Sequence, residues 1–374
     1  MDLSLPHDIG LQLRDTNAEK IERFENILPR VHFLDVEVDL PMIKGLVQRK
    51  ERFKRLKSAR IDFTSTPYEE PPILDCLAPV TSLDLSCSFF PWTGDGTPYG
   101  LLRSVDSHWP NLTTFHGDRL PANFLRRILF SAPLLRAVTM HDTNNASSDW
   151  STVSPAPTCH VNLRHLSLTC PIYDSLPDDV LEHLHLPGLK SLHVEYGLSP
   201  KPFLSFLRDT HGSLVELSLK QSLAKLDDQR AMYTLCPALK TFLSWVEPDD
   251  LGMLVVSSQS KLCPTLRHLT LHDFDVDSAR ALADICASRG LAPFSTPDCS
   301  SGSFQLDRIT VYMELDNVSL FRQHCLGGNE NYDNPPLDTG FLLLDTVRLS
   351  LSYDHSTDFY TTTLRHPWTF PIKP

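Results

Sequence analysis

The sequence lacks paired cysteines, long apolar runs and an excess of basic charge. Its nine cysteines form no C-x-x-C pair, which argues against a disulfide framework and against a zinc site. No apolar run approaches the roughly 20 residues that span a bilayer, and the start, MDLSLPHDIG, has no signal-peptide pattern. The net charge of -12 argues against nucleic acid as the main partner. We therefore expect a cytoplasmic or nuclear protein that binds neither membrane nor nucleic acid.

Motifs for catalysis, cofactor binding and metal binding are also missing. The glycines of GDGTPYG, residues 94–100, are followed by no P-loop lysine, so we interpret this stretch as a surface loop. His183, His185 and His193 are close in the sequence, but no H-E-x-x-H occurs and no spacing places three ligands on one helix face. We expect no enzyme, no cofactor and no metal. Since a catalytic triad is recognised by geometry, an enzyme or enzyme activator with an unrecognised site remains one alternative.

One segment departs from the acidic balance of the chain. Residues 44–60, KGLVQRKERFKRLKSAR, carry eight basic residues against the single Glu51. This pattern is typical of the solvated face of a helix, and a nuclear signal or a contact with an anionic partner is the alternative.

The sequence does contain a repeat. Segments such as VNLRHLSLTCP, LPGLKSLHVEYG and CPTLRHLTLHD each carry a leucine followed three residues later by a second apolar residue. We use the first leucine as the marker of a unit. Five central markers are separated by 26, 25, 25 and 27 residues, and weaker matches extend the series in both directions. The markers are Val31, Leu56, Val80, Leu112, Leu135, Leu163, Leu189, Leu214, Leu239, Leu266, Leu306 and Leu344.

Each unit predicts one strand followed by one helix. Apolar residues two positions apart point to one face of a strand, and the residues between them point to the other face. One strand and one returning helix fit into about 25 residues, so successive strands are parallel and each unit buries its leucines only against its neighbours. This predicts a solenoid with strands on the concave face and helices on the convex face. The expected helical stretches are residues 121–133, 199–213, 227–237, 247–264 and 275–290.

The intervals between markers suggest the domain organisation. We expect an N-terminal cap or remnant in residues 1–26, the solenoid in residues 27–352 and a C-terminal tail or cap in residues 353–374. Where the intervals lengthen, we expect inserted loops, which can contribute to binding. These loops are near residues 87–108, 291–303 and 327–340.

The L-x-x-L-x-L pattern resembles the leucine-rich repeat superfamily over residues 27–352. This implies an α/β leucine-rich-repeat solenoid, with irregular repeats because the position eight residues after the marker lacks the asparagine of regular units. The Cys-Pro-x-Leu segments at Cys236 and Cys263 resemble the cysteine-containing repeats of intracellular F-box proteins. The wider rhythm is similar to the repeat region of the F-box family of mushroom-forming fungi.

This resemblance implies a protein-interaction module like the substrate-recognition half of an F-box ubiquitin-ligase receptor, with no catalysis of its own. The three-helix F-box of that family is not recognisable here, because the repeats begin by Val31. We therefore expect the ligase adaptor and cullin as partners only if an F-box is present upstream. A stand-alone scaffold or inhibitor unconnected to ubiquitin is the alternative.

The strand register names the residues of the concave face. With the marker at position i, positions i+2, i+4 and i+6 point outward, and most of these residues are small and polar. Leu243 and Trp245 break this rule and have the composition of a binding hot spot, whereas the alternative is that Trp245 packs under residues 247–250 as local core. We expect an unknown protein or peptide to bind Glu216, Lys220, Leu243, Trp245, His268, His272, Arg308 and Tyr312.

Overall fold

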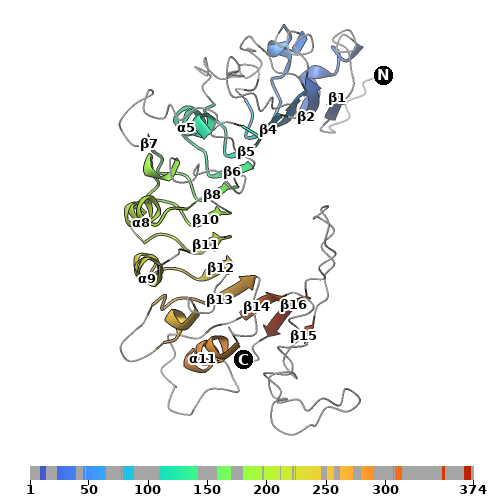
Figure 1. Cartoon of the computed structure of the whole chain (residues 1–374). Coiled ribbons are helices and arrows are strands. Elements are labelled where there is room, and N and C mark those ends of the chain that lie inside the picture. Colours follow the sequence, from blue (N-terminus) through green and yellow to red (C-terminus); the bar gives the residue numbers. More distant parts are fainter. Residues whose placement is uncertain are drawn as a thin grey trace, which may run out of the picture. The chain divides into compact units, whose positions relative to one another are not determined.

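The chain divides into two compact units, residues 1–189 and residues 190–374, each built around parallel strands. Figure 1 shows the elements of both units in the computed structural model. The structure describes residues 9–13, 23–38, 45–46, 48–64, 77, 79–87, 109–120, 122–141, 158–169, 180–195, 198–210, 212–220, 223, 225–245, 251–256, 262–272, 279–289, 306, 308–313, 348–349 and 366–371.

In the N-terminal unit, the neighbouring strands of the main sheet are parallel. Their order is β1 (Ile9–Leu13), β2 (Val31–Val38), β3 (Ser58–Phe63), β4 (Ser82–Cys87), β5 (Thr114–Asp118), β6 (Ala137–His141) and β8 (His165–Leu168). A second, parallel pair joins β7 (Thr158–Cys159) to β9 (Leu184–His185). The helical elements with described bounds are η1 (Leu28–Arg30), η2 (Lys50–Arg52) and α5 (Ala122–Ser131), and residues 45–46 and 180–182 are also helical.

In the C-terminal unit, four parallel pairs are followed by an antiparallel end. The strand order is β10 (Ser191–Val194), β11 (Glu216–Leu219), β12 (Thr241–Trp245), β13 (His268–His272), β14 (Arg308–Met313), β16 (His366–Pro371) and β15 (Arg348–Leu349). The helical elements are α8 (Pro200–Asp209), α9 (Leu226–Leu235), η3 (Gly252–Leu254) and α11 (Ala279–Ser288). In Figure 1 these helices lie on one side of β10–β13. We call the other side of the strands the open face.

The strand register predicted from the leucine pattern is confirmed. Eleven of the twelve markers lie among the described residues, and all eleven are buried. The residue two positions after a marker pairs with its equivalent in the next unit, as Glu216 pairs with Thr241 and Thr241 with His268. The next residue along each strand points to the opposite side, so Leu217 and Leu269 are buried on the helix side. The fold is therefore an α/β leucine-rich-repeat solenoid, in which each repeat adds one layer to the core that it shares with the neighbouring repeats.

A β-turn precedes most strands and explains the Cys-Pro-x-Leu segments. The N–H of Leu239 donates to the carbonyl of Cys236, and the N–H of Leu266 donates to the carbonyl of Cys263. Proline is favoured at the second position of such a turn because its φ angle is already fixed there. The cysteine at the first position points into the core and is buried in both units. These cysteines thus serve as small apolar side chains.

Four of the five predicted helical stretches form α-helices, namely α5, α8, α9 and α11. In the stretch expected at 247–264, the described residues include the α-helical Leu251, which is followed directly by η3, and residues 247–250 and 257–261 lie outside the described residues. Apart from Cys87, the loops expected at 87–108, 291–303 and 327–340 lie outside the described residues, as does the marker Leu344.

A buried arginine, Arg289, donates hydrogen bonds to backbone carbonyls of η3 and of the turn before β13. The Arg289 guanidinium donates to the carbonyl oxygens of Leu254 at 2.9 Å, Cys263 at 3.2 Å and Leu262 at 2.9 Å. Arg289 follows α11 and is 1% exposed, and this burial lowers the pKa of its guanidinium. Three charge-assisted hydrogen bonds offset the cost of burying the cation and connect the residue after α11 to η3 and to the turn at Cys263.

The C-terminal end differs from the regular repeat that the marker Leu344 predicts. A twelfth unit would place its strand directly beside β14, but β16 occupies that edge, antiparallel to β14, and β15 pairs with β16 instead. The edge strand of a parallel sheet carries unpaired N–H and C=O groups that an antiparallel strand can pair equally well. Residues 366–371 therefore continue the sheet beyond β14. At the other end, β1 pairs in parallel with β2 in the same way as the repeat strands.

The buried register predicts the effect of a charge in the core. Replacing Leu217 or Leu269 with Asp should lower the melting temperature strongly, because a carboxylate without a partner would replace a fully packed side chain. Thr270→Asp is the matched control, since Thr270 is half-buried on the open face, and it should melt close to the wild type. Thermal melting followed by circular dichroism measures all three variants. Unchanged melting of both leucine variants would contradict the register.

Candidate interaction surface

Two rows of register-aligned residues cross the strands of the C-terminal unit. The first row consists of residues two positions after the markers, and the register aligns Ser191, Glu216, Thr241, His268 and Arg308 in it. The second row follows two residues later along each strand and contains His193, Ser218, Leu243, Thr270 and Thr310. Neighbouring strands lie about 4.8 Å apart, so side chains within a row are in reach of one another.

The eight residues expected at the binding surface lie on four consecutive strands, β11–β14, with Lys220 directly after β11. Glu216 is exposed, while Lys220, Leu243, His268 and His272 are half-buried. The backbones of Trp245, Arg308 and Tyr312 lie in β12 and β14, and Trp245 pairs with His272. The side chains of these three residues lie outside the described part of the chain. The choice between an exposed Trp245 and a core Trp245 therefore remains a prediction.

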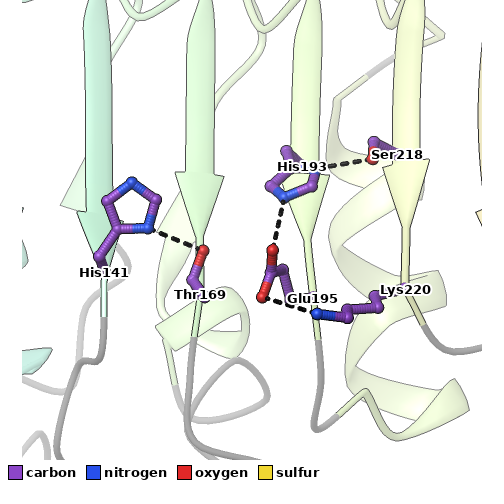
Figure 2. A network of polar contacts seen from close by, with 6 residues as sticks. All are labelled: His141, Thr169, His193, Glu195, Ser218 and Lys220. Carbon is purple, nitrogen blue, oxygen red and sulfur yellow. Dashed lines mark hydrogen bonds and ion pairs between the residues drawn. The ribbon is translucent and has the colours of Figure 1, made fainter. Parts of the chain in front are cut away.

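A polar network links the two neighbouring strands β10 and β11, as Figure 2 shows. His193 Nδ1 and Ser218 Oγ form a hydrogen bond of 2.6 Å between β10 and β11. His193 Nε2 lies 3.6 Å from Glu195 Oε1, and Lys220 Nζ lies 3.5 Å from Glu195 Oε2. A carboxylate only accepts hydrogen bonds, so Nε2 is the nitrogen that donates toward Glu195, while Nδ1 faces the Ser218 hydroxyl, which can both donate and accept.

The network also sets the charge of Glu195. The hydrogen bond from His193 is the largest cause that holds the pKa of Glu195 below its usual range, and Lys220 acts in the same direction against the effect of burial. Glu195 therefore stays ionised between two donors. Lys220, one of the expected binding residues, is held in place by this carboxylate.

Ser218, His193 and Glu195 match a catalytic triad in residue type but not in surroundings. A triad hydrolase also needs backbone N–H groups aimed at the developing oxyanion, and its serine sits on a tight turn. Ser218 lies in the middle of β11, whose backbone is paired with β10 on one side and β12 on the other. Ser218 is also only 8% exposed. The arrangement therefore suits fixed polar recognition better than acyl transfer.

The open face of the N-terminal unit carries a separate histidine cluster. The rings of His116 and His141 lie with centroids 5.1 Å apart, and His141 Nδ1 is 3.1 Å from Thr169 Oγ1. Within the described ranges, no group of three or more His, Cys, Asp or Glu residues is placed to hold a metal ion. No helix in the part of the chain that the structure describes is long and apolar enough to cross a membrane.

Three of the thiols are poor nucleophiles. Burial is the main cause that raises the pKa of Cys87, Cys236 and Cys263 to about 12. At Cys87 the nearby carboxylates of Asp62 and Asp118 add to this effect. Since the thiolate is the reactive form, these three side chains are protonated and inert near neutral pH.

Counted from the markers Leu189 and Leu214, His193, Glu195 and Ser218 occupy outward positions i+4 and i+6, but the sequence does not connect them. The signal was present in the register, because Glu195 follows His193 by two residues and Ser218 is the equivalent of His193 in the next unit. The sequence could not show that the two side chains turn toward each other across the strands.

The network predicts a pH-dependent contribution to stability. A carboxylate with a lowered pKa in the folded chain stabilises the fold above its unfolded pKa, and this contribution is lost as the pH falls through the folded pKa. Glu195→Gln should therefore be less stable than the wild type at pH 7, and the difference should vanish in acid. Urea unfolding from pH 7 to pH 3 measures the difference, with Glu216→Gln on the neighbouring strand as the matched control. A difference that is constant over this range would contradict the charge role of Glu195.

Comparison with known proteins gives similarity to solved structures only. No family model matches the sequence, and no curated protein matches it. Similar solved structures include a Bacteroides fragilis protein, with 13% identity, a TM-score of 0.36, and coverage of 71% of this chain and 68% of that chain. They also include the leucine-rich repeat-containing protein LegL7 from Legionella pneumophila, with 13% identity, a TM-score of 0.40, and coverage of 87% of this chain and 99% of that chain.

Proposed function

We propose that this chain is a protein-interaction module that binds a protein or peptide across the open face of its C-terminal unit. The observation that carries the proposal is the ordered polar face, in which His193, Glu195, Ser218 and Lys220 hold one another in place near the half-buried Leu243. Side chains that are already fixed lose little conformational entropy when a partner binds. A preorganised polar rim beside an apolar residue is the composition of a protein interface.

The shape and charge of this face support a protein or peptide rather than a small molecule. Small-molecule sites are concave and bury most of the ligand, whereas these residues are spread in parallel rows over several strands. The rows include Glu216, Arg308 and two histidines, so both signs of charge are present. Such a surface selects its partner by complementary placement of charges rather than by net charge.

The finer proposal is that the partner is the substrate of an F-box ubiquitin ligase. Its support is the Cys-Pro-x-Leu turn at Cys236 and Cys263, which resembles the repeats of F-box proteins. In this role the chain recognises the substrate and performs no chemistry, and the ligase adaptor and cullin bind through an F-box upstream. A module that captures partners without ligase components would instead be a scaffold or an inhibitor.

The hot-spot hypothesis predicts selective loss of binding. Partners captured on the wild-type chain are purified, and their affinities are measured by calorimetry against Trp245→Ala and Leu243→Ser. Each variant should weaken binding by roughly 2 kcal/mol, the usual scale for truncating an interface anchor. Leu226→Ser is the matched control, because Leu226 is an exposed apolar residue on α9, away from the open face. If Trp245→Ala lowers the melting temperature sharply and spares binding, Trp245 belongs to the core.

The ligase hypothesis predicts how the adaptor binds. The purified 374-residue chain should show no binding to the ligase adaptor by calorimetry, whereas a fusion with an F-box placed before Met1 should bind it. Micromolar or tighter binding by the unfused chain would reveal a degenerate box within this sequence. A fusion that binds the adaptor but captures no substrate would favour the scaffold or inhibitor role.

A further inference from the structure

Large apolar side chains gather at one corner of the N-terminal unit. Phe130 at the end of α5 is 85% exposed, Leu134 in the following turn is 49% exposed, and Val161 in the turn before β8 is 58% exposed. Of the large apolar residues in the described ranges, only Phe33 and Leu226 are also exposed. We call Phe130, Leu134 and Val161 the corner patch.

Hydrogen bonds hold the two turns of the corner patch side by side. The Asn162 side-chain amide donates to the carbonyl of Pro133 at 2.8 Å, so the turn that contains Val161 lies against the turn that contains Leu134. Between these turns, His160 Nε2 lies 3.0 Å from the carbonyl of Ala132, and the N–H of Leu163 donates to His160 Nδ1. The His160 ring is buried. These hydrogen bonds therefore fix the positions of the two turns that carry Leu134 and Val161.

The core of the unit is complete without the corner patch. The helix α5 already buries Phe124, Leu125, Ile128 and Leu129, and Leu135 is buried as the marker of the next strand. Phe130 and Leu134 stand beside these residues and add nothing to the packing. An exposed group of large apolar side chains lowers solubility, and on folded proteins such groups commonly mark interaction sites.

The charge around the corner patch is opposite to that of the whole chain. Arg136 and Arg164 directly follow the markers Leu135 and Leu163, which end the two turns of the patch, and residues 119–141 and 158–169 contain no acidic residue, although the whole chain has a net charge of -12. Arg136, directly after the marker Leu135, is exposed. A partner with acidic groups would gain from this local field. Arg119 is left out of this argument because it forms an ion pair with Asp118 at 3.9 Å, and Arg126 is left out because it is buried.

We propose that the corner patch binds a short segment of a partner protein that carries apolar anchor residues flanked by Asp or Glu. This surface is distinct from the open face of the C-terminal unit and goes beyond the function proposed above. A second copy of the chain fits less well, since three side chains cannot approach the roughly 800 Å² per partner that a stable dimer buries. A peptide with two or three anchors needs no larger surface.

The probe is a displayed library of random 12-residue peptides, selected on the full 374-residue chain and counter-selected on Phe130→Ser. The enriched peptides should combine large apolar residues with a net negative charge. Their affinity should fall at least tenfold for Phe130→Ser and for Leu134→Ser. It should also fall for Arg136→Glu and with added salt, because the acidic flanks face positive charge. Leu226→Ser, whose side chain is 47% exposed on α9, is the matched control and should bind as the wild type does.

The remaining outcomes overturn the proposal. Peptides that bind all variants equally would place binding elsewhere, and a library that yields no peptide would show that the patch takes no such segment. Enrichment of basic peptides would contradict the charge argument. Analytical ultracentrifugation of the wild type and Phe130→Ser tests whether a second copy of the chain binds the patch. Dimerisation that the variant abolishes would assign the patch to another copy of the chain. Equal melting temperatures of the variants, expected from the exposure of these side chains, keep each comparison interpretable.

Discussion

The fold depends on one hydrogen-bond arrangement that recurs at the start of the strands. The carbonyl of Lys190 accepts two N–H groups of the next unit, from Val215 at 2.8 Å and Glu216 at 2.9 Å, and the carbonyl of Val215 accepts two from the unit after it. The same arrangement recurs in the N-terminal unit at Lys57, Thr81, Thr113 and Arg136. It fixes each strand relative to the next before any side chain is considered. A slip of one residue would turn every buried leucine to water, so the leucine pattern and the backbone arrangement enforce the same register.

The open face inherits its order from this register. Because equivalent residues lie opposite each other, His193 meets Ser218 on the next strand. Glu195, which directly follows β10, contacts both His193 and Lys220, and Lys220 directly follows β11. Isolated surface ion pairs contribute little to stability, since holding two long side chains together costs entropy. Here the sheet already fixes the backbone positions, so the network can hold charges ready for a partner at a small additional cost.

The two proposed surfaces have different physical origins. The open face is a product of strand periodicity, which places one residue in two toward water and makes a regular polar array. The corner patch comes from the end of α5, which carries Phe130, and from the turns before β6 and β8, which carry Leu134 and Val161. Residues in these turns are not constrained by strand pairing or by helix packing. Their apolar character is therefore not explained by the fold, which is why it points to binding.

The sequence alone determined the markers, the strand register and four helices, because the facing of a residue within a strand or helix follows from local periodicity. It also named the outward positions that include Glu216, Lys220 and Leu243. Tertiary structure decided which side chains meet across strands, as in the contact of His193 with Ser218, and it placed β16 beside β14. It alone buried the charged Arg289 and exposed the apolar Phe130. For Arg289 and Phe130 the residue type suggests the opposite environment. The environment of a residue depends on whether carbonyls, strands or core side chains that are distant in the sequence lie close enough to contact it.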